Sequence, residues 1–302
     1  MTRTIDFIVL FRERAPKRQE TVDDRRDFET QFDCCDFRCD PTKPGNFPYF
    51  TLLISFAQIA VFIYFYTLDK DAEGVQYYDI DGFNRNTLCT PIILSPWHRQ
   101  EVWRYFLYQF NHAGWSHLFS NMLFQFSLGS LIETVHGTRD VIVIYFGGVV
   151  MGACTGLAMS PDKMTVGASG GDYALVFAYL ANLIINWDSM VAGKVWKWVR
   201  LVFLVWFIGM DVWNFFANKM ASVSIGGHLG GAIVGLTLGL YVLENFYQSR
   251  GEKYVQYIGL SLFICFVIFS ICWQSFHPSL RLRDDELPPC RYFKDCAAEC
   301  QN

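Results

Sequence analysis

The sequence predicts an all-α protein that crosses a membrane several times. Of its 302 residues, 52% are hydrophobic and 17% aromatic, and the mean hydropathy is +0.19. Only 18% are charged, against about 25% in an average soluble protein. Apolar runs recur at the length of about 20 residues that a helix needs to cross the hydrocarbon core of a bilayer. These three observations predict a polytopic helical membrane protein.

The first predicted element is a charged arm, residues 1–48, which lacks the apolar segment of a cleavable signal peptide. We expect this arm to be cytosolic and largely disordered. Seven apolar runs follow, over about 49–67, 116–135, 141–159, 166–187, 199–217, 225–247 and 254–273. The first six form a core over 49–247 with an external loop at 68–115. The seventh lies within 248–277, and an external tail with cysteines covers 278–302.

The charges of the short loops predict the orientation of the spans. With a cytosolic N-terminus, the cytosolic loops carry six Lys or Arg and the short external loops carry two, as the positive-inside rule favours. The C-terminus is then lumenal or extracellular. The second, fourth and sixth spans all begin at the outer face. Four cysteines become external and could form two disulfides in any of three pairings: Cys89, Cys290, Cys296 and Cys300.

A serine among glycines opens the fourth span, in the stretch "TVGASGGDYALVF". One interpretation is that small residues let two helices approach closely, while Ser169 bonds back to its own helix. The other is that the glycines leave room for a substrate and Ser169 is a nucleophile. A nucleophilic serine also needs a base within hydrogen-bond reach and donors for the oxyanion.

Candidate partners for Ser169 occur in the two other spans that start at the outer face. The sixth span opens with "SIGGHLGGAIVG", which contains His228, and the second with "HAGWSHLFSN", which contains His112, His117 and Asn121. The last two are four residues apart and share a helix face. Each polar residue alone could simply form a hydrogen bond between two helices. Because polar groups in lipid are costly, their gathering at one depth indicates a functional site.

Four glycines of the sixth span keep a four-residue spacing: Gly227, Gly231, Gly235 and Gly239. This spacing predicts a seam on which a neighbouring helix packs. Such a seam would bring the sixth span close to the fourth, as a Ser–His pair requires.

The stretches "GASGG", "GGHLGG", "HAGWSHLFSN" and "EVWRYF" resemble the motifs of rhomboid intramembrane serine proteases, over roughly residues 97–275. The seventh span resembles the animal secretory-pathway branch of rhomboid-like proteases. The resemblance implies a six-helix core plus a seventh helix. It also implies a catalytic dyad of Ser169 and His228 without a carboxylate. The oxyanion would be held by the side chains of Asn121 and His117 and by the backbone N–H of Ser169.

The same resemblance implies supporting roles for further residues. Gly167 would shape the turn before the nucleophile, His112 would support the site, and Trp103 and Arg104 would be structural residues of the outer loop. Two positions depart from the usual pattern: Gly227, where alanine is common, and Asp172, where a hydrophobic residue is common. Asp172 could favour the N-terminus of its helix electrostatically, or it could alter the pocket and the choice of substrate.

Together these features predict a serine endopeptidase, a multi-pass hydrolase that cuts transmembrane segments of single-pass proteins near the outer or lumenal face and releases external fragments. Growth-factor precursors are a familiar substrate class for this branch. No cofactor or metal is expected, since there is no HExxH motif, and a net charge of −4 without a basic stripe argues against nucleic acid. Golgi, plasma membrane and endosome remain open. The alternatives are an inactive rhomboid-like protein that binds or escorts membrane clients, and a transporter or channel.

Overall fold

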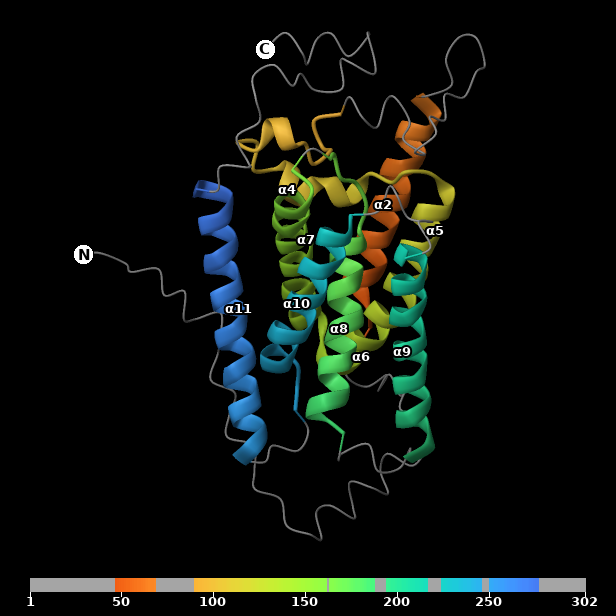
Figure 1. Ribbon diagram of the computed structural model, residues 1–302. Helices are drawn as coiled ribbons and strands as arrows, with labels where there is room; N and C mark the ends of the chain where they lie inside the picture. Colours follow the sequence, from red (N-terminus) through yellow and green to blue (C-terminus); the bar gives the residue numbers. More distant parts are fainter. Residues whose placement is uncertain are drawn as a thin grey trace, which may run out of the picture. The chain divides into compact units, whose positions relative to one another are not determined.

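The computed structural model describes residues 47–68, 90–161, 163–187, 194–216, 224–245 and 250–276. Within these segments every regular element is a helix (Figure 1). The long helices are α2 (Tyr49–Leu68), α7 (Thr138–Met159), α8 (Ser169–Ile185), α9 (Lys194–Phe216), α10 (Ile225–Val242) and α11 (Arg250–Phe276). The second predicted span is a composite of α5 (Trp115–Phe124), the π-helix η4 (Gln125–Gly129) and α6 (Ser130–His136). The predicted all-α fold is confirmed.

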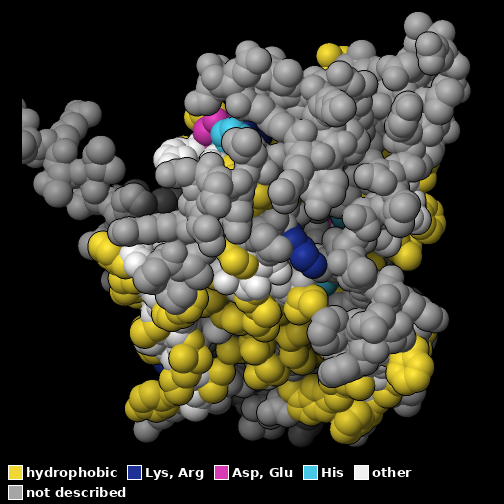
Figure 2. Space-filling model, turned by 45° about the horizontal axis from the view of Figure 1, so that its top comes forward, with side chains coloured by type: hydrophobic (Ala, Val, Ile, Leu, Met, Phe, Trp, Pro, Cys, Tyr) yellow, Lys and Arg dark blue, Asp and Glu magenta, His cyan; other side chains and the backbone are white. Residues whose placement is uncertain are grey.

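Each of the seven predicted spans is helical, although several boundaries are shifted: α9 begins at Lys194 where 199 was expected, and α10 ends at Val242 where 247 was expected. The fourth was expected from residue 166, but α8 begins at Ser169, because Gly167 has a φ of +110° that no right-handed helix accommodates. Four helices are long and apolar enough to cross a membrane: Tyr49–Thr67, Thr138–Met159, Ile225–Val242 and Lys253–Phe276. Hydrophobic side chains cover most of the lower part of the described surface in Figure 2, as expected for helices in lipid.

Several predicted segments lie outside the described residues. These are the arm up to residue 46, the loop 69–89 and the tail 277–302. The four predicted external cysteines lie in the last two of these segments. The described part of the external loop, 90–114, contains η2 (Pro96–His98), α4 (Arg104–Leu107) and η3 (Tyr108–Phe110).

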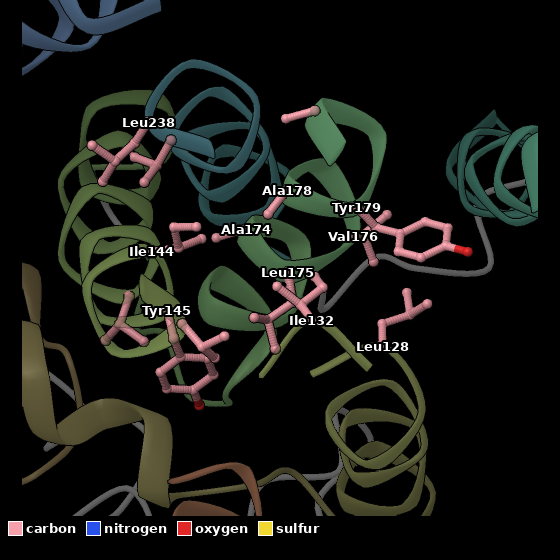
Figure 3. Packing of buried hydrophobic residues seen from close by; sticks show 14 of the residues in the cluster. Leu128, Ile132, Ile144, Tyr145, Ala174, Leu175, Val176, Ala178, Tyr179 and Leu238 are labelled. Atoms are coloured by element: carbon pink, nitrogen blue, oxygen red, sulfur yellow. The ribbon is translucent and has the colours of Figure 1, made fainter. Parts of the chain in front are cut away.

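Helices α8 and α10 pack against each other through glycine. A Cβ atom at Gly231 would meet the carbonyl oxygen of Gly170, and one at Gly235 would meet the carbonyl oxygen of Ala174. Gly239 continues this seam one turn further along α8. Equal four-residue steps on both helices mean that α8 and α10 run parallel at the same depth, as predicted. Figure 3 shows the small side chains of this interface between the two helices.

The predicted glycine seam is wrong in one member. Gly227 does not face α8; its nearest neighbours are Ser224, at the start of its own helix, and Gly152 of α7. A second pair of glycines, Gly226 and Gly230, continues this other side of α10, where added Cβ atoms would meet the backbone of α7. Glycine therefore allows α10 to approach two helices at once, which places its N-terminal end beside that of α8.

The C-terminal half of the second span is fixed by a buried carboxylate. Glu133 of α6 accepts hydrogen bonds from the backbone N–H groups of Phe50 and Thr51, both at 2.8 Å, and from the hydroxyl groups of Thr51 and Thr138, at 2.6 and 2.8 Å. The first N–H groups of a helix have no partner within the helix, and Glu133 satisfies two of those of α2. This contact ties α6 to α2 and leaves α5 to reach the other end of the span, which is predicted to be external.

Candidate active site

The turn before Ser169 is held by the outer loop. The backbone groups of Leu94 and Thr165 exchange two hydrogen bonds, of 3.1 and 3.0 Å, and the N–H of Gly167 donates to the carbonyl of Tyr108 at 3.2 Å. The chain then enters α8 at Ser169, which is half-buried. As the first residue of the helix, Ser169 has a backbone N–H without an intrahelical partner.

His117 of α5 lies directly over this turn. A Cβ atom at Gly167 would come within 2.6 Å of Cε1 and 2.8 Å of Nε2 of the His117 ring. The Nδ1 atom accepts a hydrogen bond from the N–H of Ala113 at 3.2 Å. A neutral imidazole with an acceptor at Nδ1 carries its proton on Nε2. The donor of His117 is therefore on the side of the ring that faces the Ser169 turn.

Asn121 and His112 surround His117. Asn121 is buried, and its amide nitrogen donates to the carbonyl of His117 at 2.9 Å, which leaves the second N–H of the amide for another acceptor. His112 is buried with its ring edge-on to that of His117, the ring centroids lying 5.4 Å apart. The structure thus brings together the three residues that the second span was predicted to supply.

His228 of α10 lies beside the first turn of α8. Its ring stacks on Tyr173, with centroids 4.0 Å apart and an angle of 15° between the planes. Tyr173 is four residues after Ser169 and shares its helix face. Ser169, His228 and His117 therefore meet at one end of three helices.

Tyr173 is a site residue that the sequence analysis missed. A flat contact of this kind restrains the orientation of the imidazole without taking either ring nitrogen. The available signal was its position, one turn after the serine on a face that also had to meet the histidine helix. Without knowledge of which side of α10 faces α8, an aromatic residue there was not distinguishable from one that packs in the core.

The two predicted structural residues of the outer loop differ in burial. Arg104 is buried and donates through Nη1 to the carbonyls of Thr90 and Ile93, both at 3.0 Å, and through Nε to Glu101 at 2.6 Å. Trp103 is 48% exposed and donates from its indole to the carbonyl of Pro91 at 3.1 Å. Both side chains hold the segment that precedes the contact with the Ser169 turn.

Buried aromatic rings contact the glycines that follow Ser169. The hydroxyl of Tyr108 lies 2.8 Å from the position that a Cβ atom of Gly170 would take, and the ring of Tyr145 occupies the corresponding space at Gly171. The Tyr145 hydroxyl accepts from Gln58 at 2.8 Å and donates to Gln109 at 2.9 Å. In the part of the chain that the structure describes, no group of three or more potential ligands is arranged to hold a metal ion.

Comparison with known proteins assigns the class that this fold and site suggest. A model of the Rhomboid domain matches residues 99–245. Rhomboid-related protein 1 of Caenorhabditis elegans is 34% identical over 245 residues, which are 77% of this chain and 67% of the relative. Rhomboid-related protein 3 of Homo sapiens is 32% identical over 275 residues, 88% of this chain and 63% of the relative. Rhomboid-related protein 2 of Mus musculus is 32% identical over 235 residues, which are 76% of this chain and 75% of the relative.

The chain therefore belongs to the rhomboid family, in its animal branch, and is a multi-pass integral membrane protein. It spans about two thirds of the length of the first two of these relatives. Names within the family differ in activity. Inactive rhomboid-related protein 2 of Caenorhabditis elegans is 30% identical over 226 residues, 73% of this chain and 60% of the relative. Rhomboid-like protease 2 of Toxoplasma gondii is 25% identical over 233 residues, which are 73% of this chain and 77% of the relative.

Proposed function

We propose that this protein is an intramembrane serine protease in which Ser169 is the nucleophile and His228 the general base. The observation that carries the proposal is the stacking of His228 on Tyr173, one turn after Ser169, beside a glycine contact between α8 and α10. A Ser–His pair needs its two side chains at one depth and without a bulky residue between the helices. The contact between Gly231 and Gly170 supplies both conditions.

In this mechanism neutral His228 accepts the Ser169 proton while Oγ attacks the carbonyl carbon of the scissile peptide bond. The negative charge that develops on the carbonyl oxygen is stabilised by Nε2–H of His117, the free amide N–H of Asn121 and the backbone N–H of Ser169. Protonated His228 then donates its proton to the leaving amine, so an acyl-enzyme forms on Ser169. Water, activated by His228, hydrolyses this ester and restores the dyad.

The proposed substrates are transmembrane segments of single-pass proteins, cut near the outer or lumenal face, as growth-factor precursors would be. The dyad lies at the ends of α8 and α10 where each helix begins. The loop charges predict these ends at the outer face, with a cytosolic N-terminus and a lumenal or extracellular C-terminus. A substrate helix would therefore be reached near one end, and the fragment released would be external.

The second candidate is a rhomboid-like protein that binds or escorts clients without cutting them. It is favoured by the similarity to a relative named inactive and by Asp172, a buried acid one turn from the nucleophile. Intact Ser169 and His228 favour the protease.

The experiment uses the full chain, purified in detergent and expressed in cells with a panel of tagged single-pass membrane proteins. A fluorophosphonate probe should label the wild type, and an external fragment should appear with at least one substrate. Ser169→Ala and His228→Ala should abolish both signals at equal expression. Ser261→Ala is the matched control, because this hydroxyl donates only to the backbone of its own helix, α11, at 2.8 Å. Wild-type protein that retains clients but neither labels nor cuts would establish the inactive binder.

A further inference from the structure

A buried acid lies one turn after the proposed nucleophile and takes no part in the mechanism. Asp172 is in the first turn of α8 and is only 2% exposed. Neither of its carboxyl oxygens has a hydrogen-bond partner among the described residues. Buried polar atoms are almost always paired, so an unpaired pair of oxygens calls for a specific explanation.

Among the described residues, no basic side chain acts on Asp172. The titratable groups with which it interacts electrostatically in the described chain are the phenols of Tyr108, on η3, and Tyr145, on α7. Both phenols are themselves committed: Tyr108 donates to the carbonyl of Val149 at 2.8 Å, and Tyr145 donates to Gln109. No Lys, Arg or His among the described residues neutralises the carboxyl group of Asp172.

An ionised carboxylate at this position would be costly. The N-terminus of α8 attracts a negative charge, but neither Asp172 oxygen accepts one of the free N–H groups there. Burying a charge with neither a counter-ion nor a hydrogen bond costs more than the helix dipole returns. The uncharged acid is the form that fits the packed first turn.

We propose that Asp172 is packed as an uncharged carboxylic acid, and that its ionisation displaces the first turn of α8 and with it Ser169. This inference rests on the proposed function, since Ser169, which this turn carries, is the proposed nucleophile. The link is direct in the structure: Gly170 and Gly171 connect Ser169 to Asp172 and are pressed against the two tyrosines. A charged Asp172 can reach water only if this turn moves, and the turn carries Ser169.

The first experiment does not depend on catalysis. Thermal unfolding of the full chain in detergent is followed between pH 5 and pH 10 in a Ser169→Ala background, with Asp172 or with Asp172→Asn. The midpoint of the Asp172 protein should fall on the alkaline side, while Asp172→Asn, which cannot ionise, should stay level. Asp140→Asn at the other end of the membrane core serves as the matched control, and it should keep the alkaline fall.

The second experiment follows the rate at which a fluorophosphonate probe labels Ser169. Above the pH at which Asp172 ionises, the wild-type rate should fall about tenfold per pH unit, because the rate follows the fraction of protein with an uncharged Asp172. Asp172→Asn and Asp172→Val should both remove this fall. The proposal is overturned if Asp172→Asn retains the wild-type alkaline fall. It is equally overturned if folded Asp172→Asn does not label at any pH, because a carboxylate would then be required. Failure of the wild type to label at all contradicts the proposed function, while the unfolding experiment still tests the charge state of Asp172.

Discussion

Gly231 of α10 lies against the carbonyl oxygen of Gly170 of α8, with no space for even a methyl group between the two helices. This contact is one residue from Ser169 and one turn from His228. It sets the distance between the two helices that carry the proposed dyad. Packing and chemistry therefore depend on the same pair of glycines.

Replacing Gly231 by alanine should separate the two helices at the site. The added methyl group would meet the Gly170 backbone, and an overpacked core typically loses about 1–3 kcal/mol. The displaced helices carry Ser169 and His228. The rate at which a fluorophosphonate labels Ser169 should therefore fall by more than the loss of folded protein, judged from the lower unfolding midpoint, would explain. Both quantities are measured on the same preparation.

Gly209→Ala is the control for this prediction. Gly209 is in α9, and nothing lies within 4 Å of the position that its Cβ atom would take. Alanine there should leave labelling unchanged and stabilise the helix slightly, since glycine is a poor helix former. Equal effects of the two substitutions would contradict the assignment of Gly231 to the interface.

Gly167→Ala should damage the site through two separate causes. A φ of +110° is unfavourable for alanine, and the new methyl group would come within 2.6 Å of the His117 ring. Gly137→Ala isolates the first cause, because Gly137 has a φ of +92° in open space. Both variants should lose stability, by about 1–3 kcal/mol for the backbone alone. Only Gly167→Ala should also lose most of its cleavage rate; similar rates for the two would show that His117 tolerates the contact.

Asn121→Ala tests the oxyanion site. Removing one donor of this kind lowers kcat by about 10²–10³-fold in serine proteases, and KM should change little because the charge develops only after binding. Asn182→Ala is the matched control. Asn182 is also a buried asparagine, but it pairs with His136 and Asn186 at the other end of α8, so it should lower stability and leave kcat per folded molecule intact. A higher KM with an unchanged kcat for Asn121→Ala would assign the residue to substrate binding.

Arg104→Lys should loosen the outer loop even though the charge is kept. The guanidinium group reaches Thr90, Ile93 and Glu101 at once, and an ammonium group cannot reproduce this planar set of donors. Leaving a buried carbonyl unpaired costs about 1–3 kcal/mol. We expect faster proteolysis within residues 90–110 by an added soluble protease, measured by mass spectrometry of the fragments. Cleavage as slow as in the wild type would show that the loop is held without Arg104.

Much of the fold follows from the sequence because lipid imposes a simple rule. Every span must be apolar and helical to satisfy its backbone, so hydropathy alone locates seven helices. The parallel direction of α8 and α10 follows from counting spans, and the matched steps of Gly231 and Gly235 confirm it. The same counting predicted that Ser169, His117 and His228 would share one depth, and the structure places them together.

What the sequence does not reveal depends on rotation about each helix axis. A spacing of four residues does not say which side of α10 meets α8, so Gly227 was wrongly placed in that seam. For the same reason neither the stacking of Tyr173 nor the burial of Asp172 was foreseeable. Positive φ at Gly167, which starts α8 three residues later than hydropathy indicates, depends on contacts with the outer loop.

The π-helix η4 divides the second span into two halves that must face different partners. Its five residues, Gln125–Gly129, accommodate one residue more than an α-helix of equal length. Since each residue of an α-helix turns the chain by about 100°, this extra residue sets the angle between Glu133, which holds α2, and His117, which lies over Gly167. Deleting one residue from η4 would keep both Glu133 and His117 in the protein but would turn one of them away from its neighbour. The extra residue in η4 thus determines which neighbour each half of the span contacts.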